Sequence, residues 1–237
     1  MNTRDYSKEF PHDTTVCGKH SVFFPKNIMC VIAGSTGSGK TNLICHLLKE
    51  PGILNYSDVY VYSPTLYQPV YKYLQSYYSN LEEFIKQKSR GSNKIAHFYG
   101  TDDEIVDPST LRDDQNHIMI FDDVMLNDQT LIKQYFCRGR HNHVNVFYLC
   151  QSLHKIAKHC IRDNANIFIL FKQDDKTMKY FHETHISGDM DFKEFKTFYD
   201  SVWRKKFSFI VINLWDDAEC GRYLDSYTGV YIPKKYL

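Results

Sequence analysis

The chain of 237 residues is long enough for one large hydrophobic core and short for two. Lys and Arg total 29 against 28 Asp and Glu, so the net charge of +1 excludes any inference about partners from bulk charge. Seven cysteines, an odd number with no C-x-x-C pair, favour buried thiols in a reducing compartment over a disulfide framework. We find neither a charged-then-apolar signal peptide nor an apolar run near the roughly 20 residues of a membrane span. We therefore expect an intracellular protein without a membrane span.

The first elements in chain order are a polar arm, a buried strand and a helix. Residues 1–25 predict the arm, and 26–237 predict a single domain because no linker divides them. Residues 28–33 (IMCVIA) form a continuous apolar run, which is typical of a strand covered on both faces of a parallel sheet. A helix is predicted over 40–49, since its apolar residues share one face and Pro51 follows.

The rest of the chain alternates strand-like and helix-like segments. A Tyr-rich helical stretch continues to about residue 88, and its tyrosines fit amphipathic packing or stacking on nucleic acid. A third helical stretch is predicted at 191–203, where aromatic residues recur at helical spacing. Further strands are predicted at 58–63, 95–100, 117–123, 144–151, 166–171 and 207–215, with a partly helical segment between 151 and 166. This alternation predicts an α/β sandwich around a mostly parallel sheet.

A phosphate-binding motif follows the first strand. GSTGSGKT fits the pattern G-x-x-x-x-G-K-[ST], and its glycines allow the tight turn that aims backbone N–H groups at phosphate oxygens. Lys40 is expected to reach the β- and γ-phosphates, and the Thr41 hydroxyl to bind Mg²⁺. The helix that begins near Lys40 adds its N-terminal partial positive charge. The predicted ATP-binding residues are Gly34, Ser35, Thr36, Gly37, Ser38, Gly39, Lys40, Thr41 and Asn42.

The apolar strand at 117–123 ends in two carboxylates, Asp122 and Asp123. Nucleotide sites in open α/β sheets lie at the carboxyl ends of strands, so we expect Asp122 to hold Mg²⁺ opposite Thr41, usually through water. Asp123 would orient the attacking water and accept its proton. The alternative is that the pair caps the following helix. A strand candidate intervenes between the P-loop strand and this one, which favours the additional-strand division of P-loop ATPases over the nucleotide-kinase division.

A third apolar strand ends in Gln151, whose amide either contacts the γ-phosphate or the lytic water, or belongs to an uninvolved loop. The three strand ends, GSTGSGKT, IMIFDD and RGRHNHVNVFYLCQS, resemble in this order the FtsK–HerA superfamily. More narrowly, they are similar to the poxvirus-type packaging ATPases of large DNA viruses, virophages and polinton-like elements. The resemblance covers roughly residues 25–215. It departs at Asn145, where many relatives have a small hydroxyl residue.

The resemblance implies a RecA-like P-loop core in a three-layer sandwich. It implies a homo-oligomeric ring, pentamer or hexamer, that threads double-stranded DNA into preformed capsids by ATP hydrolysis. It also implies viral capsid vertex proteins as partners, and a location at virus assembly sites in the infected cell or in the virion. The catalytic residues would be Lys40, Asp123, Gln151 and Arg140.

A basic segment carries the last of these residues. No acidic residue occurs between Leu131 and Arg162. The segment can be a surface that follows the DNA backbone, or a solvated basic face. A third interpretation makes Arg138 or Arg140 a finger that stabilises charge in the ATP site of the neighbouring subunit. The family resemblance favours Arg140.

Two other functions stay open. Nucleoside or nucleotide kinases use the same P-loop, although the Arg-rich lid that such kinases usually carry is not evident in this sequence. A nucleotide-dependent assembly factor would bind ATP tightly without turnover. The complete set of Lys40, Thr41, Asp122 and Asp123 argues against this second alternative.

Overall fold

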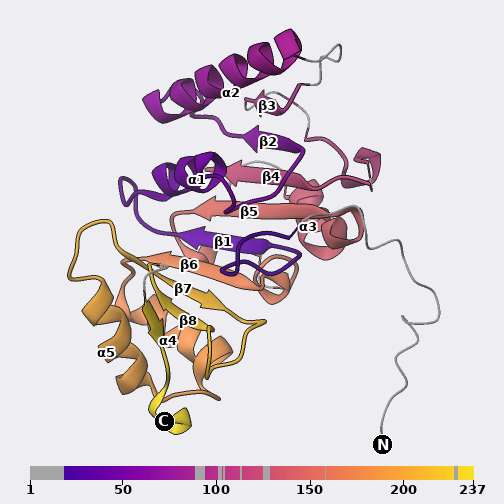
Figure 1. The fold of residues 1–237 in the computed structure, drawn as a ribbon. Helices are drawn as coiled ribbons and strands as arrows, with labels where there is room; N and C mark the ends of the chain where they lie inside the picture. The colour runs from indigo at the N-terminus through magenta and orange to yellow at the C-terminus, as the bar shows by residue number, and fades with distance from the viewer. Residues whose placement is uncertain are drawn as a thin grey trace, which may run out of the picture.

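The computed structural model places most of the chain around a single nine-stranded sheet (Figure 1). It describes residues 19–88, 94–100, 103, 105–112, 114–124, 129–157, 159–226 and 229–237, with the side chains of 140, 141 and 155 outside the description. The predicted arm lies almost entirely outside the described residues. None of the described helices is long and apolar enough to cross a bilayer.

The strand order in the sheet is β3-β2-β4-β5-β1-β6-β7-β8-β9. The six strands from β3 to β6 in this order run parallel, and the last three are antiparallel. The strands are β1 Met29–Ala33, β2 Asp58–Tyr62, β3 Ala96–Tyr99, β4 His117–Asp122, β5 Val144–Cys150, β6 Ile167–Phe171, β7 Phe209–Asn213, β8 Tyr223–Asp225 and β9 Gly229–Tyr231. Parallel strands flanked by helices on both faces read as continuous apolar runs, and β1, β4, β5 and β6 are buried along their whole lengths.

Helices cover both faces of the sheet, so the fold has three layers. The α-helices are α1 Lys40–Lys49, α2 Pro69–Lys88, α3 Thr130–Arg138, α4 Asp175–Phe181 and α5 Phe192–Val202. The buried side chains of α1 and α2 form one core with one face of the sheet. Those of α3, α4 and α5 form the second core with the other face. Side chains alternate between faces along each strand, which divides the apolar runs between the two cores.

Two buried asparagines fix the entry to β1. The Asn145 side-chain oxygen accepts from the N–H of Ile28 at 2.9 Å, and the Asn166 oxygen accepts from the N–H of Met29 at 2.8 Å. The Asn166 amide also donates to the carbonyl of Asn27 at 2.7 Å. Asn145 of β5 and Asn166, directly before β6, therefore both bind the segment that enters β1.

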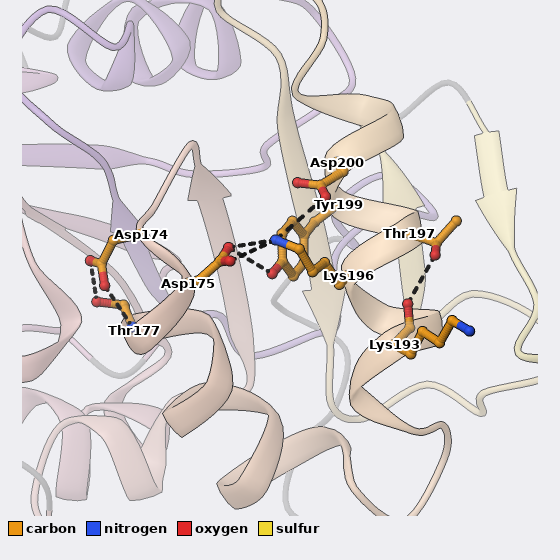
Figure 2. A network of polar contacts seen from close by, with 8 residues as sticks. All are labelled: Asp174, Asp175, Thr177, Lys193, Lys196, Thr197, Tyr199 and Asp200. Carbon is orange, nitrogen blue, oxygen red and sulfur yellow. Dashed lines mark hydrogen bonds and ion pairs between the residues drawn. The ribbon is translucent and has the colours of Figure 1, made fainter.

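The junction of α4 with α5 is a polar network on the surface (Figure 2). Asp174 caps α4, since its carboxylate accepts from the backbone N–H and the hydroxyl of Thr177 at 2.9 and 2.6 Å. Lys196 of α5 reaches across to Asp175 of α4 at 2.7 Å and also contacts Asp200 at 3.5 Å. Exposed pairs of this kind contribute little to stability, so the apolar residues beneath them hold the two helices on the sheet.

The predicted strands and the three predicted helical stretches are confirmed, with boundaries that move by a residue or two. The inserted strand is also confirmed, because β2 and β3 intervene in the chain and β5 lies between β1 and β4 in the sheet. Sequence reasoning missed α3, α4 and the short strands β8 and β9. The described part of the segment between 151 and 166 forms two 3-10 turns, Leu153–Lys155 and Arg162–Asn164, where partial helix was expected.

Candidate active site

The P-loop connects the carboxyl end of β1 to the first turn of α1. A Cβ at Gly34 would lie 2.6 Å from Ser38 Oγ and 2.7 Å from Phe171 Cβ, so the position tolerates only glycine. Gly39, the residue that precedes α1, has a φ of 110°, which an L side chain rarely adopts. With this conformation the loop lies at the N-terminus of α1, where backbone N–H groups and the helix dipole favour an anion.

Lys40 belongs to the first turn of α1 and is nearly buried. Its ammonium donates to the carbonyls of Gly34 at 2.7 Å and Ser35 at 3.1 Å. An ammonium has three N–H donors, and in the described part of the chain these contacts leave one for a phosphate oxygen. Burial lowers the pKa of Lys40, and the nearby charge of Asp122 opposes that shift.

Asp122 ends β4 beside the P-loop. Its Oδ2 atom accepts from the Thr41 hydroxyl at 3.3 Å and from the hydroxyl of Tyr71 on α2. Burial raises the pKa of Asp122 above its usual range, while the Tyr71 hydrogen bond and the Lys40 charge oppose the rise. A threonine hydroxyl beside a carboxylate is an oxygen donor set that Mg²⁺ prefers. The residues present therefore fit a magnesium ion between Thr41 and Asp122.

Asp123 and Gln151 meet at the same edge of the sheet. Asp123 has a φ of 57°, a left-handed conformation that aspartate tolerates better than most residues. The Gln151 amide donates to Asp123 Oδ1 at 3.4 Å. Helix α3 begins only at Thr130, and the residue before it, Gln129, occupies its cap position. The two aspartates therefore do not cap this helix, which removes the alternative interpretation of the pair.

These residues line one hollow at the carboxyl edge of the sheet. It unites the P-loop, the two aspartates and the strand end of β5, together with Thr65 and Gln68 from the connection between β2 and α2. The lining residues are Thr36, Gly37, Lys40, Thr41, Thr65, Gln68, Asp122, Asp123, Leu149, Cys150 and Gln151. Ser38 Oγ is buried in the loop with no hydrogen-bond partner among the described atoms. Asn42 lines an adjoining hollow on the other side of the loop.

Sequence reasoning did not assign Tyr71, Thr65 or Gln68 to the site. The helical spacing of Tyr71, Leu74 and Tyr78 indicates a buried face, and all three side chains are buried. That spacing does not indicate which residue on the buried face of the helix contacts Asp122. The stacking hypothesis for the tyrosines does not fit Tyr71 or Tyr78, because both rings are covered.

The two arginines considered as fingers, Arg138 and Arg140, precede β5 and lie at the opposite edge of the sheet. Arg138 is the last residue of α3 and is exposed, and Arg140 belongs to the 3-10 turn η3 (Gly139–Asn142) directly before β5. The Arg140 side chain lies outside the described part of the structure. In Figure 1, α3 lies at the starting end of the β4 and β5 arrows. The structure thus brings Lys40, Asp123 and Gln151 together and leaves the backbone of Arg140 apart from them.

Comparison with known proteins connects this arrangement to viral proteins. The family described as "Poxvirus A32 protein" matches residues 21–213. The genome packaging NTPase B204 from Sulfolobus turreted icosahedral virus 2, solved in complex with ATP-gammaS, is 12% identical with a TM-score of 0.52, covering 85% of this chain and 97% of that chain. B204 described as the DNA-packaging ATPase from Sulfolobus turreted icosahedral virus is 15% identical with a TM-score of 0.51, with coverages of 85% and 97%.

Likeness at such low identity concerns the fold, and it confirms the α/β P-loop architecture with a mostly parallel sheet. No curated protein sequence matches this chain significantly. The family match is independent of the structural likeness, and it spans most of the chain, including the P-loop, both aspartates and Gln151. This chain is therefore a member of the poxvirus A32 protein family.

Proposed function

We propose that this protein is an ATPase that moves double-stranded viral DNA into preformed capsids. The observation that carries the proposal is the convergence of Lys40, Thr41, Asp122, Asp123 and Gln151 on one hollow. Membership of the A32 family supports it, as does the likeness to two structures whose names give a genome packaging NTPase with ATP-gammaS and a DNA-packaging ATPase.

In the proposed hydrolysis, each of these side chains has a separate role. The P-loop N–H groups and Lys40 hold the phosphates and stabilise the negative charge that develops on the terminal one. Thr41 and Asp122 would hold Mg²⁺, which would neutralise charge on the β- and γ-phosphates. Asp123 orients the attacking water and accepts its proton. Gln151, hydrogen-bonded to Asp123, keeps this carboxylate in place and links it to β5.

Translocation requires partners beyond one subunit. We infer a homo-oligomeric ring, pentamer or hexamer, around the DNA, with residues 26–237 as the ATPase domain and 1–25 as an arm. We propose that this ring docks on viral capsid vertex proteins at the place where the virus assembles. Arg140 lies far from the ATP site of its own subunit, which suits a role at the boundary between subunits.

The test is ATP turnover by the full chain with and without linear duplex DNA. We expect turnover that duplex DNA stimulates, and no turnover in Lys40→Ala with or without DNA. Asp123→Asn should still bind nucleotide while its turnover falls by roughly 10²- to 10⁴-fold, the usual contribution of a general base. Phosphate transfer to a nucleoside would show a kinase, and tight ATP binding without turnover would show an assembly factor. Either result would contradict the proposal.

A further inference from the structure

A second hollow adjoins the P-loop on the side away from the two aspartates. It shares Gly37, Lys40, Thr41 and Gln68 with the first hollow. Beyond these, its lining is largely aromatic and apolar, and includes Phe171, Phe207, Phe209 and Val70. The phosphate cradle therefore lies between a carboxylate-lined hollow and an aromatic one.

The carboxylates determine which end of a nucleotide enters each hollow. Asp122 and Asp123 must act at the terminal phosphates, since the metal and the attacking water belong there. A triphosphate in the P-loop consequently directs its γ-end to the carboxylate-lined hollow. Its α-phosphate and nucleoside point toward Thr41, Asn42 and the aromatic hollow.

Phe207 is placed at this second hollow by the pairing of β7 with β6. These strands are antiparallel, with Phe209 opposite Phe171, so the turn that precedes β7 lies at the carboxyl end of β6. A Cβ at Gly39 would lie 3.7 Å from Phe207 Cδ1 and 3.4 Å from Phe171 Cε1. The Phe207 ring therefore adjoins the loop that receives the phosphates.

The conformation of Phe207 is unusual for an aromatic residue. Its φ is 65°, in the left-handed region where bulky side chains are outliers, and 57% of the residue is exposed. Backbone strain of this kind clusters at ligand-binding positions. The Ser208 hydroxyl supports the turn, because its oxygen lies 2.7 Å from the carbonyl oxygens of both Val202 and Lys205 and its single O–H donates to one of them. Lys206 Nζ lies 4.9 Å from the ring centroid, over the ring.

We propose that Phe207 is the base-binding residue of this protein, on which the purine ring of the nucleotide stacks. The proposal rests on the proposed ATPase function and adds the nucleoside half of the site. Phe171 and Phe209, whose rings are 5.3 Å apart, form the apolar floor beside the stacked base. Stacking recognises the π-face and not the base edge, so adenine and guanine nucleotides bind similarly and the smaller pyrimidines bind more weakly.

The experiment measures the affinity of the full chain, with Mg²⁺ present, for ADP, GDP, CDP and inorganic pyrophosphate by titration calorimetry. These probes avoid hydrolysis, and pyrophosphate lacks the nucleoside. Phe207→Gly removes the ring and suits the positive φ. We expect it to weaken ADP and GDP binding by about 5- to 100-fold, the range for loss of one base–aromatic stack, and to leave pyrophosphate binding unchanged. Phe207→Trp should retain ADP affinity.

Trp215→Ala is the matched control. Trp215 is 55% exposed and follows the other end of β7, at the far edge of the sheet. The Trp215→Ala variant should bind ADP as the wild type does. If Phe207→Gly fails to fold, Phe207→Leu replaces it, because leucine keeps apolar bulk without an aromatic face. Unchanged ADP affinity in the variant, or an equal loss for pyrophosphate, would overturn the proposal.

The Lys40→Ala variant distinguishes a failure of the stacking proposal from a failure of the proposed ATPase function. Loss of the P-loop cation should weaken ADP and pyrophosphate alike, whereas loss of the ring affects nucleotides alone. If Lys40→Ala binds both probes normally, the nucleotide site itself is wrong. If only the Phe207 variants behave as the wild type does, the ATPase assignment stands and the stacking residue is another one.

Discussion

Tyr71 holds the carboxylate that is proposed to serve the metal. It is fully covered in α2, and its hydroxyl donates to Asp122 Oδ2, the same oxygen that Thr41 contacts. A buried carboxylate without such donors loses much of its preference for the charged form. Tyr71 is therefore a positioning residue, since it acts on the metal site through Asp122 and not by contact with the nucleotide.

Tyr71→Phe removes this hydroxyl and keeps the ring. We expect nucleotide affinity to remain and the Mg²⁺ concentration for half-maximal turnover to rise about tenfold, the lower end of the range for loss of a partner behind a metal ligand. A magnesium titration of ATP turnover measures the shift. A purely structural role would instead lower stability and leave the titration midpoint in place.

Tyr78→Phe is the control for this substitution. Tyr78 is equally buried on the same helix, but its hydroxyl pairs with that of Tyr56 at 2.6 Å, away from Asp122. Both variants lose one buried hydroxyl contact, so their thermal stabilities should fall by similar amounts. Equal shifts of the magnesium midpoint in the two variants would contradict the assignment of Tyr71.

Among the elements, the C-terminal segment is bound to the domain by two carboxylates, those of Asp189 and Glu194. Asp189 follows the turn after α4, and its Oδ2 accepts from Arg222 at 2.6 Å and from the Tyr223 hydroxyl at 2.5 Å. Its Oδ1 accepts from the Tyr236 hydroxyl at 3.2 Å. Burial alone would raise the pKa of Asp189, but the hydrogen bonds from Tyr223 and Arg222 bring it below its usual value.

Asp189→Asn should lower the free energy of unfolding by about 2 kcal/mol at neutral pH, because charge-assisted hydrogen bonds are lost. A carboxyl whose pKa is lower in the folded than in the unfolded chain stabilises the fold above its unfolded pKa, near 4. The stabilisation is lost as the pH falls through the folded pKa. The difference between wild type and variant should therefore be constant from about pH 5 to 8 and shrink below about pH 4.

Urea unfolding at several pH values measures this difference. Asp200→Asn is the comparison, since Asp200 is exposed on α5 and pairs only at 3.5 Å with Lys196. It should have little effect at any pH. A difference for Asp189→Asn that does not change between neutral and acidic pH would show that its ionised form does not stabilise the segment.

The sequence predicts elements well where their signals are local. The P-loop requires glycines, a lysine and a hydroxyl within eight consecutive residues, and α1 begins and ends where its spacing indicates. In contrast, β8 and β9 have three residues each, too few for an alternation to be recognised. The contact of Tyr71 with Asp122 joins residues 51 apart in the chain. It depends on how α2 packs on the sheet, which no local pattern specifies.

At the scale of the whole molecule, the ATP site and Arg140 lie at opposite edges of the sheet, separated by the length of a strand. The P-loop, the aspartates and Gln151 lie at the carboxyl edge, while Arg140 lies in the turn before β5, at the amino edge. The seven residues of β5 place these edges about 20 Å apart, at about 3.3 Å per residue. Arg140 therefore does not act on the ATP of its own subunit. A role in hydrolysis requires a neighbour, as the proposed ring provides.

If Arg140 is a finger for the neighbouring site, Arg140→Ala should lower ATP turnover by roughly 10³- to 10⁵-fold, the usual contribution of such a residue. Nucleotide binding by the isolated subunit should be unchanged, because its own P-loop is intact. Mixing Arg140→Ala with Lys40→Ala should restore part of the activity. Some interfaces in the mixed ring then pair the intact P-loop of one subunit with the intact finger of the other. Turnover of each variant alone and of the mixture measures this.

Arg138 distinguishes the finger from the two other interpretations of the basic segment. It lies two residues away and is exposed at the end of α3, so Arg138→Ala changes the local charge equally. A surface that follows DNA needs both charges, and both variants would then keep basal turnover, lose DNA stimulation and show a shallower salt dependence of DNA binding. A finger residue must reach one position in the neighbouring ATP site, so only one of the two variants would lose basal turnover. Mixing that variant with Lys40→Ala would restore part of the activity. Normal basal and DNA-stimulated rates in both variants would leave a solvated basic face.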